Sequence, residues 1–203
     1  MSIKYANDII EEIKKRGSIS VPYGFVTGEE FEKWLYENSS SLEDEVNELY
    51  RLITKILIKR NLLITTMESC TSGLIASLIT NTEGASSILK GAFVTYSNEV
   101  KIMQGVPSNV IDEYGVYSKE TSIEMAKACK NKLNANIGIG VTGTMGNLDP
   151  ANNDSSLGKV YFTIIKDEEL FSYELSIPPK ESRYEYKLIV AKSIGLRLLE
   201  ILS

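Results

Sequence analysis

The sequence predicts a layered α/β/α domain with a mixed sheet and a terminal antiparallel hairpin, preceded by a small N-terminal appendage. Three observations lead to this fold class. From Leu42 onward, short apolar runs that suit buried strands alternate with segments whose apolar residues recur at helical spacing. Two alternating strand patterns then follow each other closely, and an amphipathic helix pattern ends the chain. Alternating strands and helices are typical of layered α/β domains, and a hairpin makes the sheet mixed.

The amino-terminal segment differs from the rest of the chain. Helix patterns over residues 8–16 and 28–36 flank an extended stretch that contains proline and glycine. The run Ser39-Ser40-Ser41 has the composition of a linker. We therefore predict an appendage, residues 1–41, whose role the sequence does not indicate, and a domain, residues 42–203.

The elements of the domain follow from periodicity and from start and stop residues. A helix from Leu42 carries apolar residues at helical spacing, and Ser97 or Asn98, and later Ser118, are helix N-caps. The predicted helices are, in order, 42 to about 60, 74–80, 97 to about 105, 118 to about 133 and 181–202. The predicted strands are 61–66, 92–96, 136–142, 159–166 and 170–177.

Composition narrows the function classes. The net charge of −5 disfavours an extended phosphate-binding surface, so no nucleic-acid partner is expected. No segment approaches the roughly 18 apolar residues of a membrane span, and no signal peptide is recognisable, so we expect a cytoplasmic protein without a membrane partner. With no histidine and two cysteines, Cys70 and Cys129, a structural metal site is not expected.

The absence of histidine also limits the chemistry. Any nucleophile must be activated by Lys, Glu, Asp or Tyr, because Ser–His and Cys–His pairs are excluded. Ser69 lies in the turn Glu68-Ser69-Cys70-Thr71-Ser72-Gly73, between a strand and a helix, where open sheets bind ligands. It is a candidate nucleophile, although Ser and Thr are also ordinary helix caps. Cys70 is the second candidate, because free cysteines are more often buried apolar residues.

Lys101 is the candidate base. It lies near the start of the predicted helix that Ser97 or Asn98 opens, where the helix dipole would lower the pKa of its ammonium, and burial would lower it further. A solvated surface lysine is the alternative. The other candidates are weaker alone: Tyr96 at a strand end, Ser87 in a hydroxyl-rich turn, the loop from Thr142 and Gly143, and Arg183 at a helix start.

Several separated motifs, in order, resemble those of the CinA carboxy-terminal domain family, the nicotinamide-nucleotide amidohydrolases. The matching segments are Glu68 to Thr71 with Gly73, Gly84-Ala85-Ser86-Ser87, the run from Gly91 to Lys101, Gly105-Val106-Pro107, Tyr114 to Ser118 and Val141-Thr142-Gly143. The resemblance covers about residues 45–203 and is far more specific than any single motif.

The resemblance implies hydrolysis of nicotinamide mononucleotide to nicotinate mononucleotide and ammonia, without cofactor or metal, by a homodimer. Ser69 would be the nucleophile and Lys101 its base, with Tyr96 and Ser87 orienting groups. Backbone N–H groups at the following helix start, together with Ser87, would stabilise the oxyanion. The residues implied to lie near the mononucleotide are Thr71, Ser72, Thr142, Gly143 and Arg183.

Two departures from the family pattern keep alternatives open. Ser72 stands where the family has glycine, and the loop from Gly143 to Pro150 has fewer glycines than the family's loop. Each lost glycine adds a Cβ atom where backbone approaches a ligand. A nucleotide-binding or regulatory protein without turnover is therefore the alternative function, and a thiol amidase using Cys70 is the third.

Overall fold

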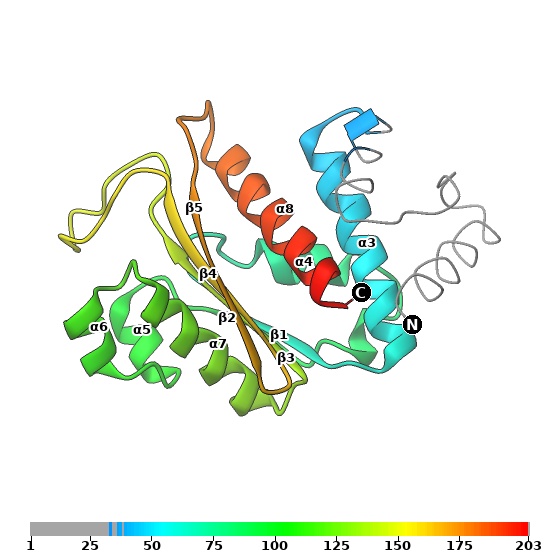
Figure 1. Cartoon of the computed structure of the whole chain (residues 1–203), viewed down its shortest axis with the longest axis horizontal. Coiled ribbons are helices and arrows are strands. Elements are labelled where there is room, and N and C mark those ends of the chain that lie inside the picture. The colour runs from blue at the N-terminus through cyan, green and yellow to red at the C-terminus, as the bar shows by residue number, and fades with distance from the viewer. Residues whose placement is uncertain (1–32, 34–35, 38, 203) are drawn as a thin grey trace.

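The computed structural model describes residues 33, 36–37 and 39–202 of the 203-residue chain. A five-stranded mixed sheet lies between two groups of helices, as the sequence predicts (Figure 1). The predicted helix over 8–16 and the extended stretch after it lie outside the described residues.

The sheet has the strand order β2-β1-β3-β4-β5. Its central part is parallel, because β1 (Ile64–Glu68) pairs in parallel with β2 (Phe93–Val94) and with β3 (Ile137–Gly143). The terminal hairpin, β4 (Lys159–Lys166) and β5 (Glu169–Ser176), continues the sheet antiparallel from β3. The carboxyl ends of β1, β2 and β3 therefore meet at one edge.

Local capping decides where the first helix begins and ends. In α3 (Leu42–Arg60), Ser41 is the N-cap, and its hydroxyl accepts the N–H of Asp44. Asn61 ends the helix in the left-handed conformation, with φ of 56°. Because Asn61 serves as this cap, the strand predicted from residue 61 begins later, at Ile64.

The remaining helices agree with the predicted ones in place, with one addition. They are α4 (Leu74–Thr80), α5 (Asn98–Met103), α6 (Ser108–Tyr114), α7 (Lys119–Leu133) and α8 (Arg183–Leu202). Helix α6 was not predicted. It is seven residues long, buries none of them fully and packs Ile111 alone against the smaller core, which is too little for periodicity to reveal it.

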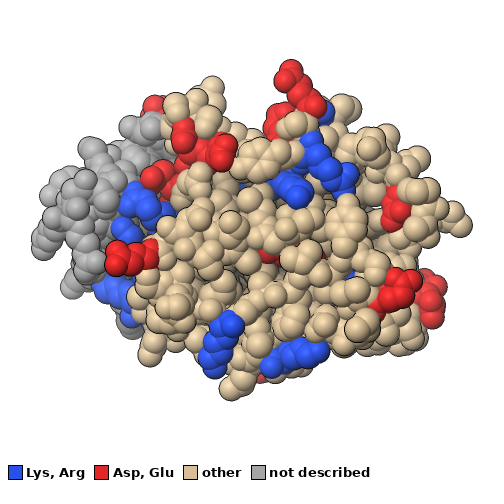
Figure 2. Space-filling model, turned by 180° about the vertical axis from the view of Figure 1, so that it is seen from behind, with Lys and Arg blue, Asp and Glu red and all other residues tan. Residues whose placement is uncertain are grey.

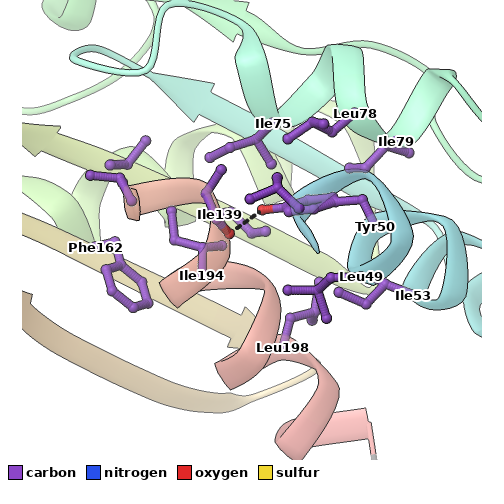
Figure 3. Packing of buried hydrophobic residues seen from close by; sticks show 14 of the residues in the cluster. Leu49, Tyr50, Ile53, Ile75, Leu78, Ile79, Ile139, Phe162, Ile194 and Leu198 are labelled. Atoms are coloured by element: carbon purple, nitrogen blue, oxygen red, sulfur yellow. Dashed lines mark hydrogen bonds between the residues drawn. The ribbon is translucent and has the colours of Figure 1, made fainter. Parts of the chain in front are cut away.

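The two faces of the sheet are packed differently (Figure 1). Helices α3, α4 and α8 cover one face with the larger core, in which the Tyr50 hydroxyl donates to the Ala191 carbonyl at 3.0 Å (Figure 3). Helix α7 lies against the other face. It approaches β3 so closely that a Cβ at Gly138 or Gly140 would collide with α7 backbone oxygens. The glycines of β3 therefore face α7, and the isoleucines that alternate with them face the larger core.

The surface carries charges of both signs. On the face seen in Figure 2, Lys, Arg, Asp and Glu are scattered among uncharged residues, and over its described part they form no single basic stripe. None of the described helices has the length and apolar composition needed to cross a bilayer.

Candidate functional site

A cavity of about 420 Å³ lies at the edge where β1, β2 and β3 end. Its walls come from the turn after β1, the segment after β2 and the loop after β3, with Tyr117 and Arg183 added from elsewhere in the chain. Parallel strands place their carboxyl ends together, and ligands of open α/β sheets bind there. The fold therefore brings the candidate residues of separated motifs to one place.

Ser69 and Lys101 form a buried pair in this site. Lys101 Nζ lies 3.1 Å from Ser69 Oγ and donates a second hydrogen bond to the Thr95 carbonyl at 2.9 Å. Lys101 is 1% exposed and Ser69 is 5% exposed. Burial lowers the pKa of Lys101 to about 8, against the opposing influence of Cys70, Asp149 and Glu99. The pair has the distance and protonation behaviour that a base and its nucleophile need.

The cause predicted for this pKa shift was partly wrong. Helix α5 has six residues, and Lys101 lies in its last turn rather than its first. The dipole of a helix favours a cation near the carboxyl end, so it does not lower the pKa of Lys101. Desolvation is the operative cause.

Cys70 is placed unlike a nucleophile. Its side chain is 2% exposed and belongs to the larger hydrophobic core. Burial raises the pKa of the Cys70 thiol to about 12, so the thiol stays protonated near neutral pH. The structure therefore favours Ser69 over Cys70.

Helix α4 is not capped by a Ser or Thr of the turn. Its N-cap is Gly73, with φ of 88°, and the free N–H groups at its start are used by the carboxylate of Glu68. These amides are thus unavailable to an oxyanion, which corrects the role predicted for them. Sequence reasoning gave Glu68 no role, although a carboxylate that ends a buried strand beside a helix start was a signal.

The structure brings three further predicted residues to the cavity. Tyr96, Gly143 and Arg183 line it, and Arg183 Nη2 donates to the Tyr96 hydroxyl at 3.0 Å. Arg183 is the first residue of α8, so a segment 87 residues away in sequence from Tyr96 completes this wall. A guanidinium exposed in a cavity is a phosphate ligand in many sites.

Four predicted residues are not brought to the cavity wall. Thr71 donates its hydroxyl to Glu68, Ser72 to the Ser69 carbonyl and Thr142 to the Val116 carbonyl. Ser87 lies exposed in a 3-10 turn whose next residue pairs with Ile64, at the opposite end of β1. Five strand residues separate it from Ser69, a distance of at least about 13 Å, so within this chain Ser87 does not reach the oxyanion.

The structure also shows a polar cluster that the sequence did not reveal. Asp149, in the loop after β3, accepts hydrogen bonds from the Tyr117 hydroxyl and from Asn152, which in turn accepts one from Asn98 at 2.8 Å. These contacts hold the loop, whose residues 147–152 line the cavity. The hydrogen bond from Tyr117 lowers the pKa of Asp149, which keeps its carboxylate charged at neutral pH. The loop has no periodicity from which this could be predicted.

The cavity therefore carries both signs of charge on different walls. Arg183 supplies a cation, while Asp149 and Glu99 supply carboxylates, and a hydrogen bond from Ser97 lowers the pKa of Glu99. Such a cavity suits a ligand with an anionic group and a cationic group. Within the described residues, no three Cys, Asp or Glu side chains gather as a metal site.

Comparisons with known proteins agree on one family. The model of the CinA C-terminal domain matches residues 46–199. A competence-damage inducible protein of Halothermothrix orenii is 39% identical over 142 residues, 69% of this chain and 32% of that protein. A CinA-like protein of Dictyoglomus thermophilum is 32% identical over 89% of this chain and 39% of its own length. The chain thus spans about a third of the length of the curated relatives it matches.

Solved structures share the fold. A competence/damage inducible protein from Agrobacterium tumefaciens superposes with a TM-score of 0.69 at 28% identity, over 77% of this chain and 94% of that one. One from Enterobacter asburiae gives a TM-score of 0.72 at 23% identity, over 78% and 98%. The second likeness concerns the fold alone.

Proposed function

The chain belongs to the CinA C-terminal domain family, and on this premise we propose that it hydrolyses the carboxamide of nicotinamide mononucleotide to nicotinate mononucleotide and ammonia. The observation that carries the proposal is the buried pair in which Lys101 Nζ lies 3.1 Å from Ser69 Oγ. The names of the matching relatives give the family and not this reaction; the geometry of the pair and the resemblance of the motifs support the reaction.

In the first half of the reaction, neutral Lys101 accepts the proton of the Ser69 hydroxyl, and the serine oxygen bonds to the carboxamide carbon. With a pKa of about 8, about a tenth of Lys101 is neutral at pH 7. The hydrogen bond to the Thr95 carbonyl orients Nζ, so that its lone pair can face Ser69. The tetrahedral intermediate collapses when the C–N bond breaks, and Lys101 returns the proton to the departing ammonia.

In the second half, water attacks the acyl ester on Ser69. Lys101 accepts a proton from this water, the ester bond breaks, and the serine oxygen recovers the proton, which leaves the carboxylate product. The Cys70 N–H is the donor we assign to the oxyanion, since Cys70 lines the cavity while its side chain lies in the core. A backbone donor beside the nucleophile is a usual oxyanion ligand.

The charges of the cavity support a zwitterionic mononucleotide as substrate. Arg183 is positioned for the phosphate, and Tyr96, to which Arg183 donates, extends that wall. Asp149 and Glu99 place carboxylates in the same cavity, where they favour the pyridinium ring over a neutral ring. A cavity of about 420 Å³ is within the usual range for small-molecule sites.

One observation favours a second function, a nucleotide-binding protein without turnover. The loop after β3 departs from the glycine-rich pattern of the family, and Leu148 there is 58% exposed. A loop that binds substrate without closing over it would retain affinity and lose rate.

The test is ammonia release from nicotinamide mononucleotide by the purified chain, with calorimetric binding measured in parallel. We expect both binding and stoichiometric ammonia release. Binding without ammonia release would support the second function. Absence of both would overturn the assignment of the cavity to this substrate. Nicotinamide riboside, which lacks only the phosphate, is the matched control and should bind far more weakly.

A further inference from the structure

Glu68, the residue before Ser69, has a fully buried carboxylate and is 0% exposed. Burying a carboxylate is costly unless donors satisfy its oxygens. Here five neutral donors do so: the hydroxyls of Thr66 at 2.9 Å and Thr71 at 2.7 Å, and the N–H groups of Gly73 at 2.9 Å, Ile75 at 3.2 Å and Ala76 at 3.0 Å. The arrangement is a built anchor for the chain that follows.

Four of the five donors follow Ser69 in sequence, so the turn that carries the nucleophile is folded around this carboxylate. On the near side, the Ser69 N–H donates to the Val141 carbonyl at 3.0 Å, which fixes the start of the turn to β3. On the far side, Thr71 and Gly73 are held by Glu68. The position of Ser69 is thus set between two anchored points.

Glu68 also holds the segment after β2, which positions Lys101. The Glu68 carbonyl accepts the Thr95 N–H at 2.8 Å, and the Thr95 carbonyl accepts the Lys101 ammonium. Glu68 therefore helps to position both members of the Ser69–Lys101 pair. Its carboxylate holds the turn that carries Ser69, and its backbone carbonyl holds Thr95, to which Lys101 donates.

The turn needs such an anchor because its backbone is strained. Ser72 has φ of 53° and Gly73 has φ of 88°, in the left-handed region. A residue other than glycine in this region, here Ser72, costs about 1 to 3 kcal/mol of folding free energy. Strained turns persist only where neighbouring contacts hold them, and here Glu68 holds Thr71 and Gly73 on either side of Ser72.

We propose that Glu68 is a positioning residue, whose carboxylate fixes the turn so that Ser69 Oγ stays within hydrogen-bond distance of Lys101. It is not a proton acceptor in the reaction, because it does not line the cavity and its oxygens are filled by the five donors. The inference rests on the proposed function only in taking Ser69 as the nucleophile. It reassigns Thr71, expected near the substrate, to the support of the turn.

A matched pair of variants separates positioning from stability. Thr71→Val and Thr66→Val each remove one hydroxyl donor from the same carboxylate at nearly constant shape, but only Thr71 belongs to the turn. We expect Thr71→Val to lower kcat about tenfold with KM within about twofold, and Thr66→Val to keep kcat within about threefold, the loss of one hydrogen bond being roughly tenfold. Thr71→Ser, which keeps the hydroxyl, should restore the rate.

Glu68→Gln tests the carboxylate itself. The variant places an amide N–H₂ opposite backbone N–H groups that can only donate, so hydrogen bonds that hold the turn are lost. We therefore expect a fall in kcat of more than about 100-fold. Because this variant also loses stability, the decisive comparison is the Thr71 and Thr66 pair. Equal falls in kcat for both threonine variants, in proportion to their loss of unfolding free energy, would overturn the proposal.

A second readout does not depend on the amide substrate. The rate of covalent labelling of Ser69 by a fluorophosphonate, followed by peptide mass spectrometry, reports the reactivity of the nucleophile. We expect Thr71→Val to slow labelling about tenfold relative to wild type and Thr66→Val to leave it nearly unchanged. A wild-type chain that is labelled at Ser69 but releases no ammonia would remove the proposed substrate and leave this inference standing. Equal labelling of wild type and Thr71→Val, or no labelling of wild type, would overturn it.

Discussion

The turn after β1 and the loop after β3 leave neighbouring strands at the same edge and meet at the cavity, yet they are built in opposite ways. In the turn, Ser69, Cys70 and Thr71 are buried and tied to Glu68 and β3. In the loop, most residues from 146 to 157 are exposed or half-buried, and side-chain contacts of Asp149 hold it.

The difference separates two tasks of one site. Reacting groups must be held within a fraction of an ångström, which a buried and fully hydrogen-bonded turn achieves. Recognition of the substrate tolerates variation, which an exposed polar loop permits. The turn keeps the family motif apart from Ser72, whereas the loop from Gly143 to Pro150 has fewer glycines than the family's loop. Changes in the turn should therefore act on kcat, and changes around the loop on KM.

The largest effect is expected in the turn. Ser69→Ala and Lys101→Met should each lower kcat at least about 1,000-fold, and the double variant should be no slower than either, because the two residues act as one unit. Calorimetric affinity for the mononucleotide should be largely kept. Steady-state ammonia release measures the rates. Cys70→Ala is the matched control and should stay within about fivefold, as expected for loss of packing alone; a Cys70→Ala variant that folds but is inactive would contradict the serine assignment.

Removing the buried ammonium should change stability in a pH-dependent way. Lys101 has a folded pKa of about 8 and an unfolded pKa of about 10.4, so the unfolded state binds more protons between these values and stability rises with pH there. The penalty is present in full below pH 8. Wild type should therefore gain roughly 2 to 3 kcal/mol relative to Lys101→Met between pH 7 and pH 10, given the folded pKa of about 8.

Urea unfolding at the two pH values measures this difference, and comparing one variant with wild type cancels the packing contributions. Lys90→Met is the control for the loss of a lysine at an exposed position. A difference for Lys101→Met that does not change with pH would mean that burial does not lower its pKa.

On the recognition side, Arg183→Ala should raise KM about tenfold to fiftyfold and keep kcat within about threefold, since a charge-assisted hydrogen bond contributes about 1.5 to 3 kcal/mol. Arg183→Lys should recover only part of the affinity, because an ammonium cannot bind phosphate bidentately. Arg197→Ala, on the same helix but about 21 Å further along it, is the control. A fall in kcat with unchanged KM would place Arg183 with the reacting groups instead.

The smallest effect is expected from the loop. Asp149→Asn keeps the shape of the side chain and removes its charge, so affinity for nicotinamide mononucleotide should fall about twofold to fivefold, as for other partly exposed charge pairs. Affinity for the reduced mononucleotide, whose ring is neutral, should hardly change. Calorimetry in the Ser69→Ala background measures both, with Asp112→Asn, at an exposed position, as control. Equal losses for the two ligands would show that Asp149 only holds the loop.

Most of this fold could be predicted from the sequence, because its helices and strands are marked by local patterns, namely capping residues and hydrophobic periodicity. Ser97 and Ser118 cap helices as expected, while Ser41, predicted as part of a linker, also caps a helix. The strands from β3 onward differ from prediction by about a residue at their ends. What failed was structure without a local pattern. Helix α6 is seven residues long and buries none of them fully, and β2 is two residues long because only Phe93 and Val94 of its predicted range pair with β1.

For the site, chemistry and family resemblance identified Ser69, Lys101, Tyr96 and Arg183, whose side chains the fold then assembles at one edge. Three-dimensional contacts could not be predicted in the same way. The role of Glu68 depends on donors up to eight residues away that face one buried carboxylate. The polar cluster around Asp149 depends on a loop without periodicity, and Ser87 was placed at the site although its turn lies at the other end of β1.

The central claim, that the turn presents Ser69 as the nucleophile, is tested most directly by trapping the acyl intermediate. Turnover of nicotinamide mononucleotide is quenched with acid on the millisecond scale, and the peptide that contains both Ser69 and Cys70 is sequenced by mass spectrometry. The account predicts the acyl group on Ser69 in wild type and in Cys70→Ala, and none in Ser69→Ala. An acyl group on Cys70, or ammonia release by Ser69→Ala at the wild-type rate, would contradict it.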